Sequence, residues 1–441
     1  MTRKMKDSGV EWIGEIPEDW EIIALKNVCK EFYSGGTPTA SNASYYTSSD
    51  NGFPFINISD LTNNKYVINV GKYITEEAAK SKGLKSVNNK YVLLAMYAST
   101  GTVSMMKIMS YISQAILAIR PDKNLQRDFL YYFLYSFKPY SDAFSRGTTQ
   151  NNLNAEIIKN LKTPMIELKT QIKIASLLDK KTEQIENIKS TIFQEIQTLE
   201  DYKKSLITEA VTKGLDKNVE MKDSGIEWIG EIPKHWKINK MGRICNVVTD
   251  FVASGSFASL AKNVKYFDDE NYAMLVRTVD LSNKRGNVGC VYVDKSSYNF
   301  LNNSNLFGGE IILPNIGASI GDVYIVPKLF NKMTLGPNSI MIKTNYVDKY
   351  YYYCFVSKIG RVILENLSIS SAQAKFNKTQ LKEVRLMQPP INDQEKIVAY
   401  LDKKCALVDS AISKKQKQLE TLEEYKKSLI YEYVTGKKEV E

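Results

Sequence analysis

The sequence predicts an α+β protein in which two mixed α/β bodies are separated by two long helices, with an internal pseudo-two-fold, circular repeat. The first observation behind this prediction is a duplicated opening. Residues 5–22 read MKDSGVEWIGEIPEDWEI and return at 221–238 with 14 of 18 positions identical. The second is a duplicated closing segment, because LEDYKKSLI at 199–207 returns at 422–430 with 8 of 9 positions identical. The third is that the segments between these matched ends scarcely agree. Two copies of one frame therefore enclose two different fillings.

Composition places the chain among soluble globular proteins. Its 441 residues are 43% hydrophobic and 24% charged, and the length suggests two to four domains. There is no run of 18 or more apolar residues, so no membrane span is expected, and the start MTRKMKDSG lacks the apolar region of a secretory signal. We therefore expect a cytoplasmic protein. The five cysteines form no CxxC pair, which argues against both a metal site and a disulfide framework.

The net charge of +10 is unevenly distributed. Residues 1–170 hold 20 basic against 16 acidic residues, and residues 218–390 hold 21 against 15. The two stretches that follow these bodies are neutral, with 8 of each sign in 171–217 and 10 of each in 391–441. Two basic bodies joined by neutral arms suit contact with a polyanion such as nucleic acid.

The first arm reads as one long helix. From Ile174 to Leu206 apolar residues recur mostly at steps of three and four, and Ile188 and Tyr202 belong to the row. Pro164 precedes the stretch and Gly214 follows it. This spacing is that of a coiled-coil seam, on a helix of about 40 residues and roughly 60 Å.

The second arm repeats the pattern from Ile397 to Leu429, with Tyr425 in the row. A long helix that is apolar on one stripe needs a partner, and a body that returns the chain between two equal arms favours antiparallel pairing. The alternative is that each arm packs on its own body. The expected seam residues are Ile185, Ile192, Ile196, Leu199, Leu206, Val408, Ile412, Leu419, Leu422 and Leu429.

We expect the bodies at residues 1–165 and 216–388 and the helices at 166–215 and 389–441. Short apolar runs such as 91–96 and 309–314 predict strands, and the aromatic stretches 129–137 and 348–359 predict buried helices. Because the frame is circular, the C-terminus should lie near the N-terminus.

The sequence contains no recognisable catalytic constellation. It has neither a GxxxxGK[ST] phosphate loop nor a GxGxxG element after a strand. The one histidine, His235, would have to serve any Ser-His-Asp or Cys-His site, and the first copy has Asp19 at its position. We expect no catalytic residue and no bound metal, and we interpret His235 as a surface residue.

With these motifs in place, the chain resembles the specificity (S) subunit of type I restriction–modification enzymes over essentially its whole length. The resemblance rests on the duplicated DSGVEWIGEIPEDW opening, YSGGTPT at 33–39 and FPFINISDL at 53–61. It also rests on GTTQNNLN at 147–154 with its counterpart SSAQAKFN at 370–377, and on the helix entries KTQIKIASLLD and NDQEKIVAYLD.

The resemblance implies that each body is a target recognition domain that reads one half of an interrupted, asymmetric site in double-stranded DNA. It implies that the helical pair sets the spacer and docks two modification (M) subunits, which bring S-adenosylmethionine and methylate adenine N6. Restriction (R) subunits would add ATP- and Mg-dependent translocation and cleavage. The chain itself would be non-catalytic and would bind no cofactor and no membrane.

Loops with small, polar or basic residues are the best candidates for DNA contact, since glycines permit a close approach to phosphate and Arg, Asn and Gln read base edges. In the first body these are Ser34, Gly35, Gly36, Thr37, Asn57, Ser99, Thr100, Arg146, Thr148 and Gln150. In the second body they are Ser254, Arg277, Asn315, Ser319, Ser371, Gln373 and Lys375. For each residue the alternative is an ordinary turn or surface role.

Three rival interpretations stay open at this point. A stand-alone sequence-specific DNA-binding regulator would be expected as a half-length chain that dimerises. A coiled-coil scaffold with no DNA role leaves the divergent basic bodies unexplained. A fused methyltransferase would require the catalytic motifs that the sequence lacks.

Overall fold

The computed structural model describes residues 3–61, 65–67, 69–97, 100–144, 152–282, 289–368 and 374–440. The chain forms two compact units of mixed helix and sheet. Unit 1 comprises residues 1–192 and 416–441, and unit 2 comprises residues 193–415. Each long helix therefore contributes one end to each unit, and the predicted α+β fold class is confirmed.

Unit 1 is built on two sheets and two small antiparallel pairs. The central sheet has the order β4-β11-β8-β9, and the second sheet has the order β10-β6-β7-β5. The central strands are β4 (Cys29–Ser34), β8 (Val92–Ala95), β9 (Val103–Met105) and β11 (Ile116–Pro121). The second sheet holds β5 (Tyr46–Thr47), β6 (Phe53–Ile56), β7 (Tyr73–Ile74) and β10 (Tyr111–Ile112). The pairs are β1 (Met5–Asp7) with β2 (Glu15–Pro17), and β3 (Glu21–Ala24) with β12 (Lys162–Met165).

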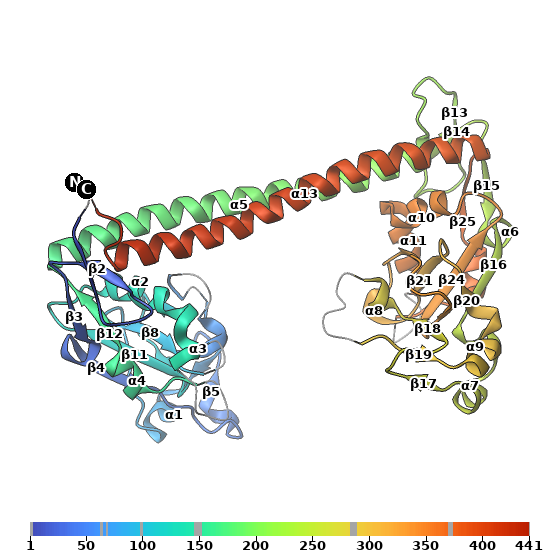
Figure 1. The fold of residues 1–441 in the computed structure, drawn as a ribbon. Helices are drawn as coiled ribbons and strands as arrows, with labels where there is room; N and C mark the ends of the chain where they lie inside the picture. Colours follow the sequence, from blue (N-terminus) through green and yellow to red (C-terminus); the bar gives the residue numbers. More distant parts are fainter. Residues whose placement is uncertain are drawn as a thin grey trace. The chain divides into compact units, whose positions relative to one another are not determined.

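One face of the central sheet of unit 1 is covered by α2 (Arg127–Phe137), which contacts β8, β9 and β11 (Figure 1). Eight of the eleven residues of α2 are buried, which confirms the buried helix expected from its aromatic run. The other short helices are α1 (Glu76–Ser81), α3 (Ser141–Phe144) and α4 (Ala155–Asn160).

Unit 2 repeats this plan with different loops. Its sheets have the orders β16-β24-β21-β22 and β17-β19-β18-β23-β20. The first contains β16 (Cys245–Asp250), β21 (Ile311–Pro314), β22 (Tyr324–Ile325) and β24 (Ser339–Thr344). The second contains β17 (Tyr266–Phe267), β18 (Ala273–Val276), β19 (Tyr292–Val293), β20 (Asn305–Leu306) and β23 (Met333–Leu335). The pairs are β13 (Met221–Asp223) with β14 (Glu231–Pro233), and β15 (Lys237–Lys240) with β25 (Arg385–Gln388).

The helices of unit 2 depart from the sequence prediction at one point, because residues 348–359 do not form a single helix. Helix α10 (Asp348–Val356) ends before Ser357, and α11 (Lys358–Ser368) begins directly after that serine. The Ser357 hydroxyl donates to the Cys354 carbonyl at 2.6 Å and accepts from the Gly360 amide at 3.1 Å. This serine therefore caps both helices, which a hydropathy pattern cannot reveal. The remaining helices are α6 (Met241–Ile244), α7 (Phe257–Asn263), α8 (Thr278–Leu281), α9 (Lys295–Phe300) and α12 (Lys378–Glu383).

The two long helices are α5 (Leu168–Lys213) and α13 (Ile391–Val434). The first turns of each pack into the core of a unit, with Ile174 and Leu178 in unit 1 and Ile397 and Leu401 in unit 2. Along the described part of the chain, no helix combines the length and apolar character that crossing a bilayer requires.

Within each unit α5 and α13 run antiparallel (Figure 1). In unit 1, Lys189 pairs with Glu423 at 2.7 Å and Glu186 with Lys426 at 2.8 Å. In unit 2, a 2.7 Å pair joins Lys203 to Asp409, and a 2.6 Å pair joins Glu195 to Lys415. In both units the partner number falls as the α5 number rises. The predicted antiparallel coiled coil is therefore confirmed, and the ends of the arms also pack on their own units.

The apolar row along α5 and α13 is only partly buried. Among the expected seam residues, Ile185, Ile192, Val408 and Leu429 are buried, while Ile196, Leu199, Leu206, Ile412, Leu419 and Leu422 are partly buried. Three further members of the row face solvent, since Ile188, Tyr202 and Tyr425 are 50–52% exposed. Residues spaced by three and four do not keep to one face of a long helix. The predicted row therefore included positions that lie outside the contact between α5 and α13.

The two ends of the chain meet in unit 1, as the circular repeat predicts (Figure 1). The Lys437 ammonium donates to the Glu15 carbonyl at 2.9 Å, and the Tyr431 hydroxyl donates to the Ile13 carbonyl at 2.9 Å. These bonds tie the end of α13 and the segment that follows it to the hairpin formed by β1 and β2.

Candidate nucleic-acid interface

The turn between β10 and β11 brings several of the predicted DNA-contact segments of unit 1 together. The Ser113 amide donates to the Ile56 carbonyl at 2.9 Å, at the end of β6. The Ala115 carbonyl accepts from the Met96 amide at 2.9 Å, and the Met96 carbonyl accepts from the Leu153 amide at 2.9 Å. The end of β6, the loop after β8 and the segment before α4 therefore meet at one place.

Unit 2 builds the same junction at the turn between β23 and β24. The Gly336 amide donates to the Val276 carbonyl at 2.7 Å, at the end of β18. The Asn338 carbonyl accepts from the Asn315 amide at 3.2 Å, and the Asn315 carbonyl accepts from the Phe376 amide at 3.1 Å. Each of these three bonds has its counterpart in unit 1. The two units thus place their divergent loops on one common backbone frame.

The glycines of the first predicted loop serve the packing of the chain itself. A Cβ on Gly35 would lie 2.1 Å from the Ile112 carbonyl oxygen, and one on Gly36 would lie 2.8 Å from Leu84 Cδ2. The Gly36 amide already donates to the Ile112 carbonyl at 3.2 Å. The structure therefore gives a reason for these glycines other than a close approach to phosphate.

The remaining predicted residues of unit 1 divide by exposure. Ser34 and Thr37 are exposed at the end of β4. Thr100 is buried, and its carbonyl accepts a 3.4 Å bond from the Ser141 hydroxyl, so its side chain is poorly placed for direct contact with DNA. The predicted residues that lie outside the described ones, in both units, are Ser99, Arg146, Thr148, Gln150, Ser371 and Gln373.

In unit 2, Asn315 holds the loop after β21 rather than facing solvent. Its side-chain amide donates to the Phe376 carbonyl at 2.9 Å. Lys375 is exposed on the segment that this bond anchors, Ser319 is partly exposed in the adjacent loop, and Ser254 is partly buried after β16. Contact between these residues and DNA stays a prediction.

Asn57 and Arg277 occupy corresponding places at strand ends. Asn57 directly follows β6 and opens the short helix Ile58–Asp60, and Arg277 directly follows β18 and opens α8. The hydrogen bond to Asp280 raises the pKa of the Arg277 guanidinium above its ordinary value, so this group stays charged.

The sequence prediction missed two polar residues at these junctions. Gln114 and Asn338 are exposed on the turns that connect the loops. Asn338 adopts φ +63°, a conformation that asparagine tolerates better than most residues. The Gly-Pro-Asn sequence at 336–338 is a turn signal that points to this position.

Each unit is fastened to its long helix by a buried tyrosine. The Tyr132 hydroxyl donates to Asp179 of α5 at 2.6 Å, and the Tyr353 hydroxyl donates to Asp402 of α13 at 2.6 Å. Burial first, and then the neighbouring carboxylate, raise the pKa of both phenols far above the ordinary value, so both stay protonated donors. A tyrosine from each of the two aromatic stretches that predicted buried helices therefore holds its unit on a long helix.

A repeated buried glutamine makes a second fastening. The side chain of Gln171 donates from Nε2 to the Ile166 carbonyl at 2.9 Å, and its Oε1 accepts from the backbone amide of Gln126 at 2.8 Å. Its counterpart Gln394 donates to the Pro389 carbonyl at 2.8 Å and accepts from the Val347 amide at 3.2 Å. The shared glutamine in the two helix entries was the available signal.

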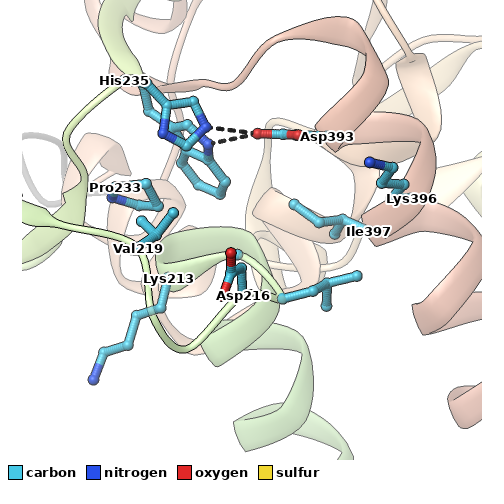
Figure 2. A pocket seen from close by; sticks show the side chains of 11 residues that line it. Lys213, Asp216, Val219, Pro233, His235, Asp393, Lys396 and Ile397 are labelled. Atoms are coloured by element: carbon cyan, nitrogen blue, oxygen red, sulfur yellow. Dashed lines mark hydrogen bonds and ion pairs between the residues drawn. The ribbon is translucent and has the colours of Figure 1, made fainter.

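A pocket of about 280 Å³ lies beside His235 in unit 2 (Figure 2). Figure 2 shows Asp393 turned toward His235. Oδ2 of Asp393 lies 2.8 Å from His235 Nε2 and 3.1 Å from Trp236 Nε1. Among the described residues that line this pocket, none carries a hydroxyl or thiol that the histidine could activate. One carboxylate oxygen of Asp393, in the first turn of α13, is thus shared by the rings of His235 and Trp236.

For three of the five cysteines, burial disfavours the reactive thiolate. Burial raises the pKa of Cys29, Cys245 and Cys354 to about 12. In the part of the chain that the structure describes, no group of three His, Cys, Asp or Glu side chains could hold a metal ion.

Comparison with known proteins bears on this arrangement. The model of the type I restriction modification DNA specificity domain matches residues 17–198 and again 233–423. The MjaX specificity subunit of a putative type I restriction enzyme of Methanocaldococcus jannaschii is 25% identical, over 96% of this chain and 95% of its own length. The MjaVIII specificity subunit of the same organism is 22% identical, over 96% and 93%.

Among solved structures, a chain from a study of complex assembly and conformational transition of the type I R-M system superposes with a TM-score of 0.68. That match covers 95% of this chain and 98% of the other, at 14% identity, and it speaks for the fold alone. The two copies of the matched domain fall on the two halves of the repeated frame. The chain therefore belongs to the type I restriction–modification DNA specificity family, and it carries the specificity domain twice.

Proposed function

We propose that this chain is the subunit that selects DNA sequence for a type I restriction–modification complex. Each unit reads one half of an interrupted, asymmetric site in double-stranded DNA. The paired helices set the length of the spacer between the halves. The chain contributes recognition and assembly, and its partners contribute the chemistry.

The observation that carries this proposal is the repeated junction with different loops. Three backbone hydrogen bonds recur in both units, yet Ser113, Ala115 and Met96 correspond to Gly336, Asn338 and Asn315. A common frame with unlike side chains suits two unlike half-sites. Base edges in the major groove are distinguished by side-chain hydrogen bonds, so changing the side chains changes the sequence that is read.

Charge supports affinity separately from specificity. The chain carries a net charge of +10, concentrated in the two bodies. Lysine and arginine contacts to phosphate release counterions and dominate the affinity of proteins for DNA. Binding should therefore weaken steeply as salt rises, while the preferred sequence stays the same.

The repeated frame also supports two equivalent docking surfaces for two modification subunits. The hairpins of β1 with β2 and of β13 with β14 pair in the same register, as the Lys6–Ile16 and Lys222–Ile232 partners show. A surface that occurs twice can bind two copies of one partner. S-adenosylmethionine would be held by these methyltransferase partners, and ATP and Mg²⁺ by restriction subunits.

The test is selection from a random-sequence DNA pool, with the chain alone and with its modification subunits. We expect the complex to methylate adenines within one bipartite motif of fixed spacer. Tight, specific binding by the chain alone would support a stand-alone regulator instead. No enriched sequence in either sample would support a scaffold without a DNA role and would overturn the proposal.

A further inference from the structure

Asn57 and Arg277 are equivalent positions held by the same backbone clamp. The Asn57 amide donates to Oδ2 of Asp60 at 2.8 Å, and the Arg277 amide donates to Oδ2 of Asp280 at 2.9 Å. In both units the aspartate lies three residues after the clamped residue. The clamp is shared and the clamped side chain differs, which is the arrangement expected of a position that distinguishes two half-sites.

The Arg277 guanidinium is fixed before any ligand arrives. Its Nε and Nη2 donate to the two carboxylate oxygens of Asp280, each at 3.0 Å, and Nη2 also donates to the Gly289 carbonyl at 2.6 Å. The Asp280 side chain is fully buried, and the Arg277 side chain is 25% exposed. Within the described part of the chain, Nη1 has no hydrogen-bond partner. The two N–H groups of Nη1 are therefore the donors left for a base, on a group that loses little conformational freedom when it binds.

The residue packed against this position changes together with it. A Cβ on Gly336 would lie 3.1 Å from Arg277 Cγ and 2.9 Å from the Val276 carbonyl oxygen. The corresponding residue of unit 1 is Ser113, beside the shorter Asn57. Glycine at position 336 therefore keeps clear of both the Val276 carbonyl and the arginine, whereas unit 1 has a serine at the corresponding place.

The two side chains match two different bases. Arginine donates to O6 and N7 of guanine, and asparagine pairs with N6 and N7 of adenine in the major groove. We infer that residues 57 and 277 are equivalent base-reading positions, with Asn57 selecting adenine in one half-site and Arg277 selecting guanine in the other. This inference rests on the proposed function and names the residues that carry it out.

The first test is Arg277→Lys in the complex with modification subunits, assayed by sequencing the DNA methylated from a random pool. Lysine keeps the charge, but its single nitrogen cannot both pair with Asp280 and present further donors to a base, as the arginine can through Nη1. We expect preference for guanine at one position of one half-site to fall roughly 5- to 100-fold, with the other half-site and the spacer unchanged. Arg361→Lys is the matched control, because Arg361 lies in the same unit and pairs with Glu365 on the surface of α11.

The second test moves the unit 2 pair into unit 1. Asn57→Arg combined with Ser113→Gly supplies both the arginine and its space. We expect guanine to replace adenine at one position of the other half-site. This variant leaves the Arg277–Asp280 pair intact. It therefore tests the inference even if a thermal melt shows that Arg277→Lys prevents the complex from folding.

The outcomes separate the inference from the proposed function. A wild-type bipartite motif that neither variant alters would overturn the inference alone. Uniform weakening on all sequences by Arg277→Lys would make the residue a phosphate contact and would also overturn the inference. A wild-type complex that selects no motif would overturn the proposed function and the inference with it.

Discussion

Gly436 ends α13 with its backbone at φ +75°, where it meets the opening hairpin of unit 1. A Cβ there would lie 2.5 Å from Pro17 Cδ and 2.8 Å from Trp20 Cη2. Its counterpart Gly214 ends α5 at φ +74°, with Trp236 Cζ2 3.3 Å from the same point. One glycine thus closes each helix against one repeated tryptophan, which only glycine can do without strain.

We predict that Gly436→Ala destabilises unit 1 more than Gly9→Ala does. Both glycines have positive φ, but nothing lies within 4 Å of a Cβ on Gly9. The backbone cost of about 1–2 kcal/mol is common to both, and overlap with Pro17 and Trp20 adds roughly 1–3 kcal/mol at Gly436. Urea denaturation of the full chain measures the difference. Equal losses for the two variants would contradict the packing argument.

At the scale of elements, ion pairs fix the register between α5 and α13. Lys203 with Asp409 in unit 2 corresponds under the repeat to Lys426 with Glu186 in unit 1. Lys426 is buried, so its charge is well shielded from solvent. Apolar contacts supply most of the attraction between helices, and paired charges select one alignment among the several that a seam permits.

The Lys189–Glu423 pair predicts a pH dependence in unit 1. Burial would raise the pKa of Glu423, but the hydrogen bond and charge of Lys189 outweigh it and lower that pKa. Burial would likewise lower the pKa of Lys189, but Glu423 and Glu186 outweigh it and raise that pKa. The glutamate contribution is therefore present above its unfolded pKa and lost as the pH falls through its folded pKa. The lysine contribution is lost only as the pH rises through the raised lysine pKa.

We therefore expect Glu423→Gln to lower the melting temperature of unit 1 at pH 7 by a few degrees and to matter progressively less below about pH 4. Thermal unfolding across pH 3–8 measures this difference. Glu76→Gln is the control, since Glu76 pairs with Lys80 at 2.8 Å and both side chains are exposed, so solvent screens their charges. A difference for Glu423→Gln that stays constant with pH would show that the ion pair is not responsible.

At the scale of the whole molecule, the helical pair predicts how the spacer responds to length. Seven residues inserted within 190–202 of α5 and within 410–422 of α13 add roughly 10 Å while preserving the seam. We expect the tolerated spacer to lengthen by about three base pairs, with both half-sites unchanged. Sequencing of methylated random DNA measures the spacer and the half-sites together.

The matched control places the insertion in α5 alone. The opposing residues of α13 are then out of register beyond the insertion, so the ion pairs that flank it cannot both form. We expect this variant to lose selective methylation and stability. A double insertion that changes the half-sites, or that leaves the spacer as it was, would contradict the proposal that the paired helices set the spacer length.

Much of the architecture could be read from the sequence because it depends on local or repeated patterns. The duplicated opening and the two apolar rows predict the repeated frame, the long helices and their antiparallel pairing. The candidate interface was less accessible. The sequence pattern predicted that Gly35 contacts phosphate, and it did not indicate Gln114 at all. The reason is that the partners of a loop residue come from strands far away in the chain.

The sequence by itself determined that this protein has two copies of one frame, two long helices, and two basic bodies with unlike contents. Only the tertiary structure decided which loops share a junction, that Ser357 divides one aromatic helix into two, and that Asn57 and Arg277 are counterparts. Helical periodicity and repetition are carried by neighbours along the chain, where sequence records them directly. The juxtaposition of Arg277, Asp280 and Gly336 depends on strand pairing across the sheet, which residue order alone does not encode.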